Sequence, residues 1–168
     1  AKIFNAMGID THDVIEAAAS KWNFIKLSPG LVGGHCISVD PYYLIQRATS
    51  RGVVPRIMME ARRLNNTMGS YVAERVVRCL NLHNIAAYNA KILLLGFTFK
   101  ENCPDVRNTK VIDIYNSLKA YTQDIRIFDP WVSKEYAKQE YGVEVSTDEK
   151  DLEKGFDYRK ITVTSIGE

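Results

Sequence analysis

Apolar residues recur at intervals of three and four positions through the first half of the chain, which predicts helices. A short helix ends at Gly8, a residue typical of a helix C-cap, and a second helix covers residues 11–20. Residues 21–39 are glycine-rich and follow no such period, so this segment is predicted to be irregular. An Asp-Pro pair is typical of a helix start and predicts a helix from Asp40 to about Arg51.

The longest helical pattern begins at Pro55 and reaches about Leu82. A helix of this length would connect two domains or form an oligomer interface. Its apolar residues recur near the 3.6-residue period, and several arginines are expected on its outer side. The apolar residues are Ile57, Ala61, Leu64, Met68, Tyr71, Val72, Val76 and Leu80, and the arginines are Arg56, Arg62, Arg63, Arg75 and Arg78.

The pattern changes near residue 89, where short apolar runs begin to alternate with helical segments. We predict strands at 92–95, 125–128, 143–145 and 160–166, and helices at 109–121 and 134–140. This alternation is typical of a doubly wound α/β domain. The fold class is therefore α/β: an all-helical segment over residues 1–88, then a Rossmann-like α/β domain over residues 89–168 that is incomplete.

Charge and cysteine content exclude several classes of protein. The 22 basic and 20 acidic residues give a net charge of +2, which offers no case for nucleic-acid binding. No apolar run approaches the roughly 20 residues of a membrane span, and the N-terminus does not have the pattern of a signal peptide. The three cysteines form no CxxC pair, so we expect a reduced, cytoplasmic protein without a metal site.

The first candidate site is the turn that carries Gly33, Gly34, His35 and Cys36. Glycines let the backbone approach a ligand closely, and a thiol just before a helix is accessible and favours the reactive thiolate. Asp40 follows Cys36 by four positions, so a near-helical segment would turn both side chains toward one site. The alternative is a tight turn that holds a buried, unreactive thiol.

A second candidate site is the loop at residues 96–109, between a predicted strand and a predicted helix, where open α/β sheets bind ligands. Lys100 and Arg107 supply cations suited to phosphate. The alternative is a charged loop paired internally, for example Asp105 with Arg107. The chain contains no GxGxxG dinucleotide fingerprint, so Asp129 at the end of the second strand is assigned to a turn with the following proline.

Together these motifs resemble those of the UDP-glucose/GDP-mannose dehydrogenase family. Residues 33–44, GGHCISVDPYYL, are similar to the family's catalytic cysteine segment, in the form found in members that oxidise UDP-N-acetylhexosamines. Residues 96–109 are similar to its second motif, GxxFKxNxxDxRN. The resemblance extends from about residue 3 to residue 156, after which the sequence departs from the family's apolar strand.

The resemblance implies a C-terminal fragment of an NAD-dependent enzyme that oxidises the C6 alcohol of a UDP-sugar to the uronic acid, for polysaccharide precursor synthesis. The reaction would proceed through a cysteine thiohemiacetal and thioester. NAD would be bound mainly by an N-terminal domain that precedes residue 1, so the fragment alone would be inactive. Residues 55–82 would form a homodimer interface. A non-catalytic UDP-sugar-binding or dimerisation module is the alternative.

The resemblance also implies a role for individual residues. Cys36 would be the nucleophile, and Asp40 would position the catalytic water or act as a base. The remaining roles are contacts with substrate or cofactor: Gly33, Phe24, Leu27, Lys100 and Lys21 with the UDP-sugar, the last possibly from a partner subunit, and Arg107 with the phosphates of NAD.

Overall fold

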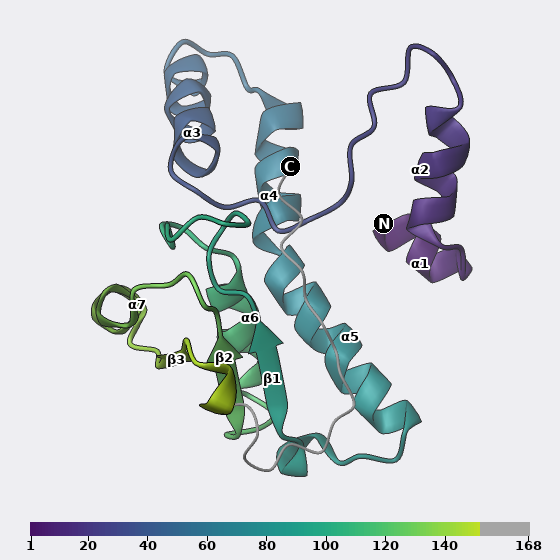
Figure 1. Ribbon diagram of the computed structural model, residues 1–168. Helices are drawn as coiled ribbons and strands as arrows, with labels where there is room; N and C mark the ends of the chain where they lie inside the picture. The colour runs from purple at the N-terminus through teal and green to yellow at the C-terminus, as the bar shows by residue number, and fades with distance from the viewer. Residues whose placement is uncertain (152–168) are drawn as a thin grey trace. The chain divides into compact units, whose positions relative to one another are not determined.

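The computed structural model describes residues 1–151, which form two compact units, one of residues 1–30 and one beginning at Leu31. The first unit contains α1 (Lys2–Met7) and α2 (Thr11–Ala19) (Figure 1). Gly8 ends α1 with a φ of 72°, in the left-handed region, as the sequence predicts. Asp10 caps α2, since its carboxylate accepts a hydrogen bond of 2.7 Å from the backbone N–H of His12.

The second unit has three α-helices and a short 3-10 helix before its first strand and then alternates strands with helices (Figure 1). Its elements are α3 (Cys36–Thr49), α4 (Arg56–Asn66), α5 (Met68–Leu82), η1 (Ala87–Asn89), β1 (Ile92–Leu95), α6 (Val111–Leu118), β2 (Ile125–Phe128), α7 (Lys134–Tyr141), β3 (Val145–Ser146) and η2 (Glu149–Asp151).

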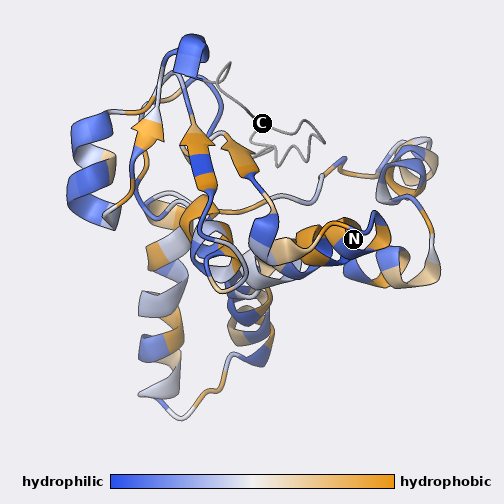
Figure 2. Ribbon diagram, turned by 90° about the horizontal axis from the view of Figure 1, so that it is seen from below, coloured by the Kyte–Doolittle hydropathy of each residue, from blue (hydrophilic) through white to orange (hydrophobic). Residues whose placement is uncertain are grey.

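The three strands form a parallel sheet in the order β1-β2-β3. Ile92 pairs with Ile125 and Leu95 with Phe128, while Ile127 pairs with Val145. Parallel neighbours need crossover connections, which α6 and α7 provide. The strands are mostly apolar and α7 is mostly polar (Figure 2). The predicted fold class, a helical segment followed by a Rossmann-like α/β domain, is confirmed.

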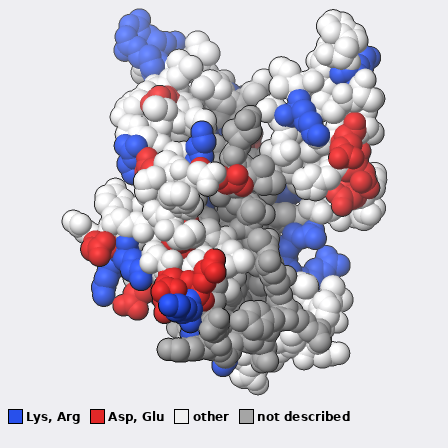
Figure 3. Space-filling view, in the orientation of Figure 1, with Lys and Arg blue, Asp and Glu red and all other residues white. Residues whose placement is uncertain are grey.

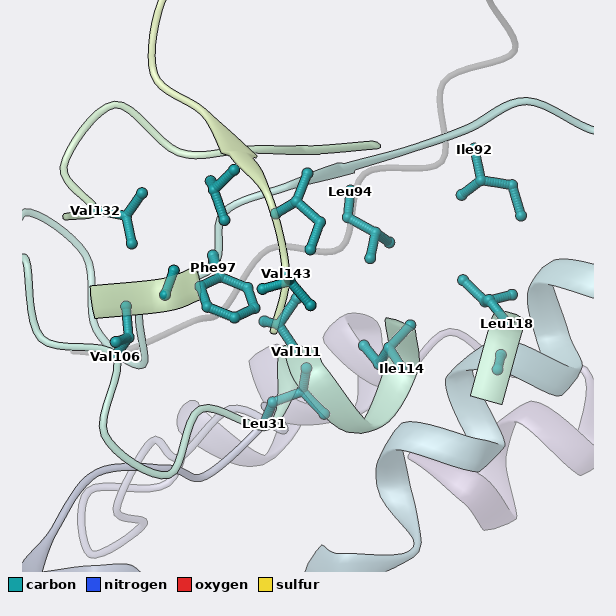
Figure 4. Close-up of a cluster of buried hydrophobic side chains, with 14 of the residues drawn as sticks. Leu31, Ile92, Leu94, Phe97, Val106, Val111, Ile114, Leu118, Val132 and Val143 are labelled. Carbon is teal, nitrogen blue, oxygen red and sulfur yellow. The ribbon is translucent and has the colours of Figure 1, made fainter. Parts of the chain in front are cut away.

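One hydrophobic core joins the sheet to α5 and α6 (Figure 4). α5 and α6 approach each other closely at Gly69, where an added Cβ would lie 2.5 Å from the Cβ of Asp113. α5 lies before the predicted domain boundary between residues 88 and 89, yet it packs into the same core as the sheet. That boundary stays a prediction. The buried apolar residues are Leu31, Ala73, Val76, Ala90, Ile92, Leu94, Phe97, Val106, Val111, Ile114, Leu118, Ile127, Val132, Ala137, Val143 and Val145.

The prediction of one helix over residues 55–82 is wrong, because the chain forms α4 and α5 with a break at Thr67. The Thr67 hydroxyl donates a hydrogen bond of 2.9 Å to the carbonyl of Leu64. Such a bond back to the preceding turn competes with the helical ladder and bends helices. The apolar stripe packs against the core only in α5, where Val76 is buried and Met68, Val72 and Leu80 are partly buried. In α4, Ile57 is 88% exposed and Leu64 is 52% exposed within the described chain.

The prediction that a helix starts at Asp40 is also wrong, since α3 begins at Cys36 and holds Pro41 inside it. The strands predicted at 92–95 and 125–128 are confirmed as β1 and β2, and the helix predicted at 134–140 is confirmed as α7. The helix predicted at 109–121 was too long, since α6 is shorter, and the strand predicted at 143–145 is only the pair Val145–Ser146. Pairing with β2 is limited to that pair, which shortens the strand. The strand predicted at 160–166 lies outside the described residues. Among residues 1–151, no helix has the length and apolar character that crossing a membrane requires.

Candidate functional site

Cys36 is the first residue of α3 and is exposed to solvent. Asp40 lies four residues further along the same helix and is also exposed. Residues four apart in an α-helix share one face, so the early start of α3 gives the two side chains a common side. Because Cys36 is exposed, the alternative of a buried thiol at this position is wrong. The other two cysteines, Cys79 and Cys103, are half-buried.

The glycines before Cys36 contact the loop that follows β1, so the two sequence motifs lie together. Gly34 donates its N–H to the Arg107 carbonyl at 3.2 Å, and its own carbonyl accepts from the Asn108 side-chain amide at 3.2 Å. A Cβ at Gly33 would lie 2.7 Å from the backbone oxygen of Asn108. Only a residue without a side chain fits there, which explains the buried glycine pair.

Arg107 forms an ion pair with Asp105 on this loop. Its Nη2 lies 2.6 Å from Asp105 Oδ2, and its Nε lies 3.0 Å from both carboxylate oxygens. The side-chain hydrogen bonds from Arg107 lower the pKa of Asp105, helped by a backbone hydrogen bond, against the opposing effect of burial. The internal pairing that the sequence leaves open is therefore present, although the Arg107 side chain remains 54% exposed.

The same loop lies within electrostatic range of the cysteine turn. The pKa of Arg107 is raised mainly by its hydrogen bond to Asp105 and, as a smaller effect, by the charge of Cys36. In the same way, His35 makes a small contribution to the low pKa of Asp105. The Arg107 guanidinium and the Cys36 sulfur are therefore close enough for a weak electrostatic interaction.

Asp129 forms the predicted turn and, in addition, fixes the start of the loop that follows β1. The predicted turn is present, because Asp129 Oδ1 accepts from the Trp131 N–H at 2.9 Å. Its Oδ2 also accepts from the N–H groups of Phe97 at 2.7 Å and Thr98 at 3.0 Å. The residue is buried, with 3% of its surface exposed. An acid directly after a parallel strand is the sequence signal for this contact.

Two residues of α4, Asn65 and Arg62, contact the cysteine segment. No sequence signal singled out Asn65, and Arg62 was predicted only as one of the arginines on the outer side of a long helix. Asn65 exchanges two hydrogen bonds with the backbone of Val32, accepting at 3.3 Å and donating at 2.9 Å. Arg62 donates from Nη1 to the carbonyl of Ile37 at 2.6 Å. Pro41 was the available signal for the second contact, because a proline in a helix leaves the carbonyl four residues earlier without its usual donor.

The remaining predicted site residues stay predictions. Lys100 is exposed, and its backbone carbonyl accepts a hydrogen bond of 3.0 Å from the Thr98 hydroxyl. Lys21, Phe24 and Leu27 belong to the first compact unit, and all three are exposed. Residues 1–151 hold no group of three or more His, Cys, Asp or Glu side chains that could bind a metal ion.

Two pockets border this region. One, of about 280 Å³, lies among α3, α4 and the start of α6 and is lined by Ser38, Tyr42, Arg62, Asn65, Asn66, Asn108, Thr109, Lys110, Ile112, Asp113 and Tyr141. The other, of about 270 Å³, lies at the carboxyl ends of β1 and β2, and its lining includes Thr98, Asn102 and Trp131. On the face of this unit seen in Figure 3, basic and acidic side chains are interspersed.

Comparison with known proteins identifies both motifs as parts of one family. Residues 1–67 match the central domain of the UDP-glucose/GDP-mannose dehydrogenase family, and residues 93–165 match its UDP binding domain. UDP-N-acetyl-D-glucosamine 6-dehydrogenase of Pseudomonas aeruginosa is 55% identical over 141 residues, which are 84% of this chain and 33% of that protein. Protein CapL of Staphylococcus aureus is 44% identical over 150 residues, 89% of this chain and 35% of that protein.

A solved structure agrees with these matches. The NDP-N-acetyl-D-galactosaminuronic acid dehydrogenase of Methanosarcina mazei is 27% identical, with a TM-score of 0.75 over 88% of this chain and 32% of that one. The chain thus spans about a third of the length of the curated relatives it matches. With central-domain sequence before β1 and UDP-binding-domain sequence from β1 onward, the chain belongs to the UDP-glucose/GDP-mannose dehydrogenase family.

Proposed function

We propose that this chain is part of an NAD-dependent UDP-sugar 6-dehydrogenase in which Cys36 is the catalytic nucleophile. The observation that carries the proposal is the placement of Cys36: exposed, at the start of α3, and on a glycine turn bonded to the loop after β1. A structural thiol needs neither exposure nor a cation within electrostatic range, and Cys36 has both.

In the proposed reaction the thiol of Cys36 holds the substrate carbon between two oxidations. The C6 alcohol first loses a hydride from carbon and a proton from oxygen, which leaves an aldehyde. The sulfur then bonds to C6 while the aldehyde oxygen takes up a proton, giving a thiohemiacetal. Loss of a second hydride and of the hydroxyl proton gives a thioester. Water adds to the thioester carbon, the C–S bond breaks, and the uronic acid leaves as the thiol regains its proton.

NAD, when bound, supplies the acceptor for both hydrides. Among the described residues, Arg107 is the candidate for contact with the phosphates of NAD. Its guanidinium is half-exposed, which favours such a contact, but it already donates hydrogen bonds to Asp105. A phosphate would have to share or replace that carboxylate. Asp40, exposed one turn from Cys36, would orient the attacking water or take its proton. Lys100 would contact the nucleotide sugar, as would Gly33 through its backbone.

For the substrate class we propose a UDP-N-acetylhexosamine. The support is the activity of the Pseudomonas aeruginosa relative, a UDP-N-acetyl-D-glucosamine 6-dehydrogenase, together with its 55% identity to this chain. Exposed Phe24 and Leu27 would contact the uridine, and exposed Lys21 would contact the substrate from its own or a partner subunit. The cysteines are free in the described structure, which fits a reducing compartment, so we place the reaction in the cytoplasm.

A second copy of the chain is the partner we propose for the surface of α4. Ile57 and Leu64 are both more than half exposed, and Val53 and Val54 just before the helix are exposed as well. Ile57 and Leu64 are seven residues apart and so share one face of α4, and exposed apolar side chains gathered on one face mark protein–protein contacts. The homodimer interface predicted over residues 55–82 would then be formed by α4, whose apolar side chains are not covered by the hydrophobic core.

A chimeric enzyme tests the catalytic proposal. The matching segment of the Pseudomonas aeruginosa dehydrogenase is replaced by this chain, and acid formation from UDP-N-acetylglucosamine is measured with NAD. Cys36→Ser is expected to abolish acid formation, whereas Cys79→Ser, at a half-buried thiol, should retain it. Full activity of the Cys36→Ser chimera would remove Cys36 from the mechanism. The 168-residue chain alone is expected not to reduce NAD, and measured reduction would contradict that expectation.

A further inference from the structure

We propose that Asn65 and Arg62 of α4 are positioning residues that hold the Cys36 segment in its reactive conformation. The inference rests on the proposed role of Cys36 as nucleophile. It extends the site to a helix that neither sequence motif contains.

Asn65 fixes the entrance to the cysteine turn. Its side-chain amide bonds both polar groups of the Val32 backbone, at 3.3 Å and 2.9 Å, so it sets the orientation of that peptide. The next two residues are Gly33 and Gly34, which have the widest choice of backbone conformations. A flexible pair needs an anchor on each side if the thiol that follows is to stay in one place.

Arg62 fixes the exit from the turn. The carbonyl of Ile37 would normally accept from the N–H of residue 41, but that residue is Pro41 and has none. Arg62 Nη1 donates to this carbonyl instead, at 2.6 Å. A hydrogen bond from a charged donor is short and strong, so it can keep the first turn of α3 helical despite the proline.

The two contacts act from one face of α4, because residues three apart on a helix are neighbours. They reach Val32 and Ile37, one on either side of Cys36 in the sequence. The loop after β1 holds the same turn through Gly34. The cysteine segment is therefore held between two elements. Removal of the Asn65 and Arg62 contacts would leave the hydrogen bonds of the loop and, from α4, the one that Asn66 donates to the Tyr42 hydroxyl further along α3.

The test measures thiol reactivity in the 168-residue chain with iodoacetamide, followed peptide by peptide by mass spectrometry. Backbone N–H groups at the helix start attract the negative charge of a thiolate, so a loosened first turn should slow the alkylation of Cys36 about two- to five-fold. This is expected in Asn65→Ala and Arg62→Ala, with unchanged rates at Cys79 and Cys103. Arg62→Lys keeps a donor and should restore much of the rate.

Arg63→Ala is the matched control, since Arg63 is next in sequence and pairs with Glu60 on the same helix. It should leave the Cys36 rate unchanged. Hydrogen exchange gives a second readout: the Val32 amide, which donates to Asn65, should exchange faster in Asn65→Ala while β1 keeps its protection. An unchanged Cys36 rate in both alanine variants would overturn the proposal. So would equal acceleration at all three thiols, which would mark Asn65 and Arg62 as residues of general stability.

These results are separable from the test of the proposed function. If the Cys36→Ser chimera stays active while the alanine variants slow alkylation, the positioning contact stands and the nucleophile role fails. If the chimera loses activity while alkylation does not respond to the α4 variants, the nucleophile role stands and the positioning proposal fails.

Discussion

The ring of Phe99 lies against Gly34, so close that a Cβ at residue 34 would lie 2.9 Å from the Phe99 Cε2 atom. Gly34 also has a φ of +87°, in the region that other residues rarely adopt. The contact joins the turn before Cys36 to the loop after β1, across more than sixty residues of sequence. It accounts for a glycine at this position on two separate physical grounds, backbone conformation and space.

Gly34→Ala is expected to destabilise the chain more than a matched change at Gly52. Gly52 has a φ of +80° with nothing within 4 Å among the described residues, so Gly52→Ala should lose only the cost of the left-handed backbone. That cost is about 1–2 kcal/mol. Gly34→Ala should lose this and also the overlap with Phe99. Urea unfolding measures both, and equal losses would show that the ring moves away without cost.

Asp129→Ala is expected to lower the free energy of unfolding by about 3 kcal/mol or more, because it leaves buried amide donors unsatisfied. Three N–H groups, those of Phe97, Thr98 and Trp131, lose their acceptor. Asp129→Asn keeps one acceptor oxygen and should lose less. Urea denaturation of both variants checks the order, and an Asn variant as unstable as the Ala variant would contradict it.

The Asp105–Arg107 pair predicts a contribution to stability that depends on pH. The hydrogen bond from Arg107 lowers the pKa of Asp105 from its ordinary value of 3.8 in the folded chain. A carboxyl with a depressed folded-state pKa stabilises above its unfolded pKa and loses this contribution as pH falls through the folded value. The stability difference between the parent and Arg107→Gln should therefore narrow below pH 3.8.

Urea unfolding at about pH 7 and about pH 3 measures that difference. Because the Arg107 side chain is half-exposed, solvent screening should keep the effect small. Arg63→Gln serves as the control, since its partner Glu60 is more exposed than Asp105. A difference of the same size at both pH values would exclude the Asp105 carboxyl as its source.

Ile57→Asp is expected to weaken self-association of the chain. Ile57 is 88% exposed on α4, and a charge there would have to be desolvated in a dimer interface. Tyr88→Asp introduces the same charge at a side chain that is 74% exposed on another element, and should leave association unchanged. Sedimentation equilibrium compares the two variants. An identical response to both would exclude α4 as the specific contact surface.

The sequence by itself determined part of the secondary structure and the family. Local signals sufficed for the cap at Gly8 and for the apolar runs that became β1 and β2. They depend only on interactions within a few residues, which a linear pattern contains. The motifs around Cys36 and Arg107 likewise pointed to the family that the comparisons confirm.

Only the tertiary structure decided where α3 begins and what holds its cysteine. A proline normally signals a helix start, but the Arg62 contact supplies the donor that Pro41 lacks and lets α3 begin earlier, at Cys36. That donor lies 25 residues away in sequence, so no local pattern reveals it. The same holds for Asp129, whose carboxylate reaches amides more than 30 residues distant. Long-range hydrogen bonds override local preference where they satisfy groups that the local chain cannot.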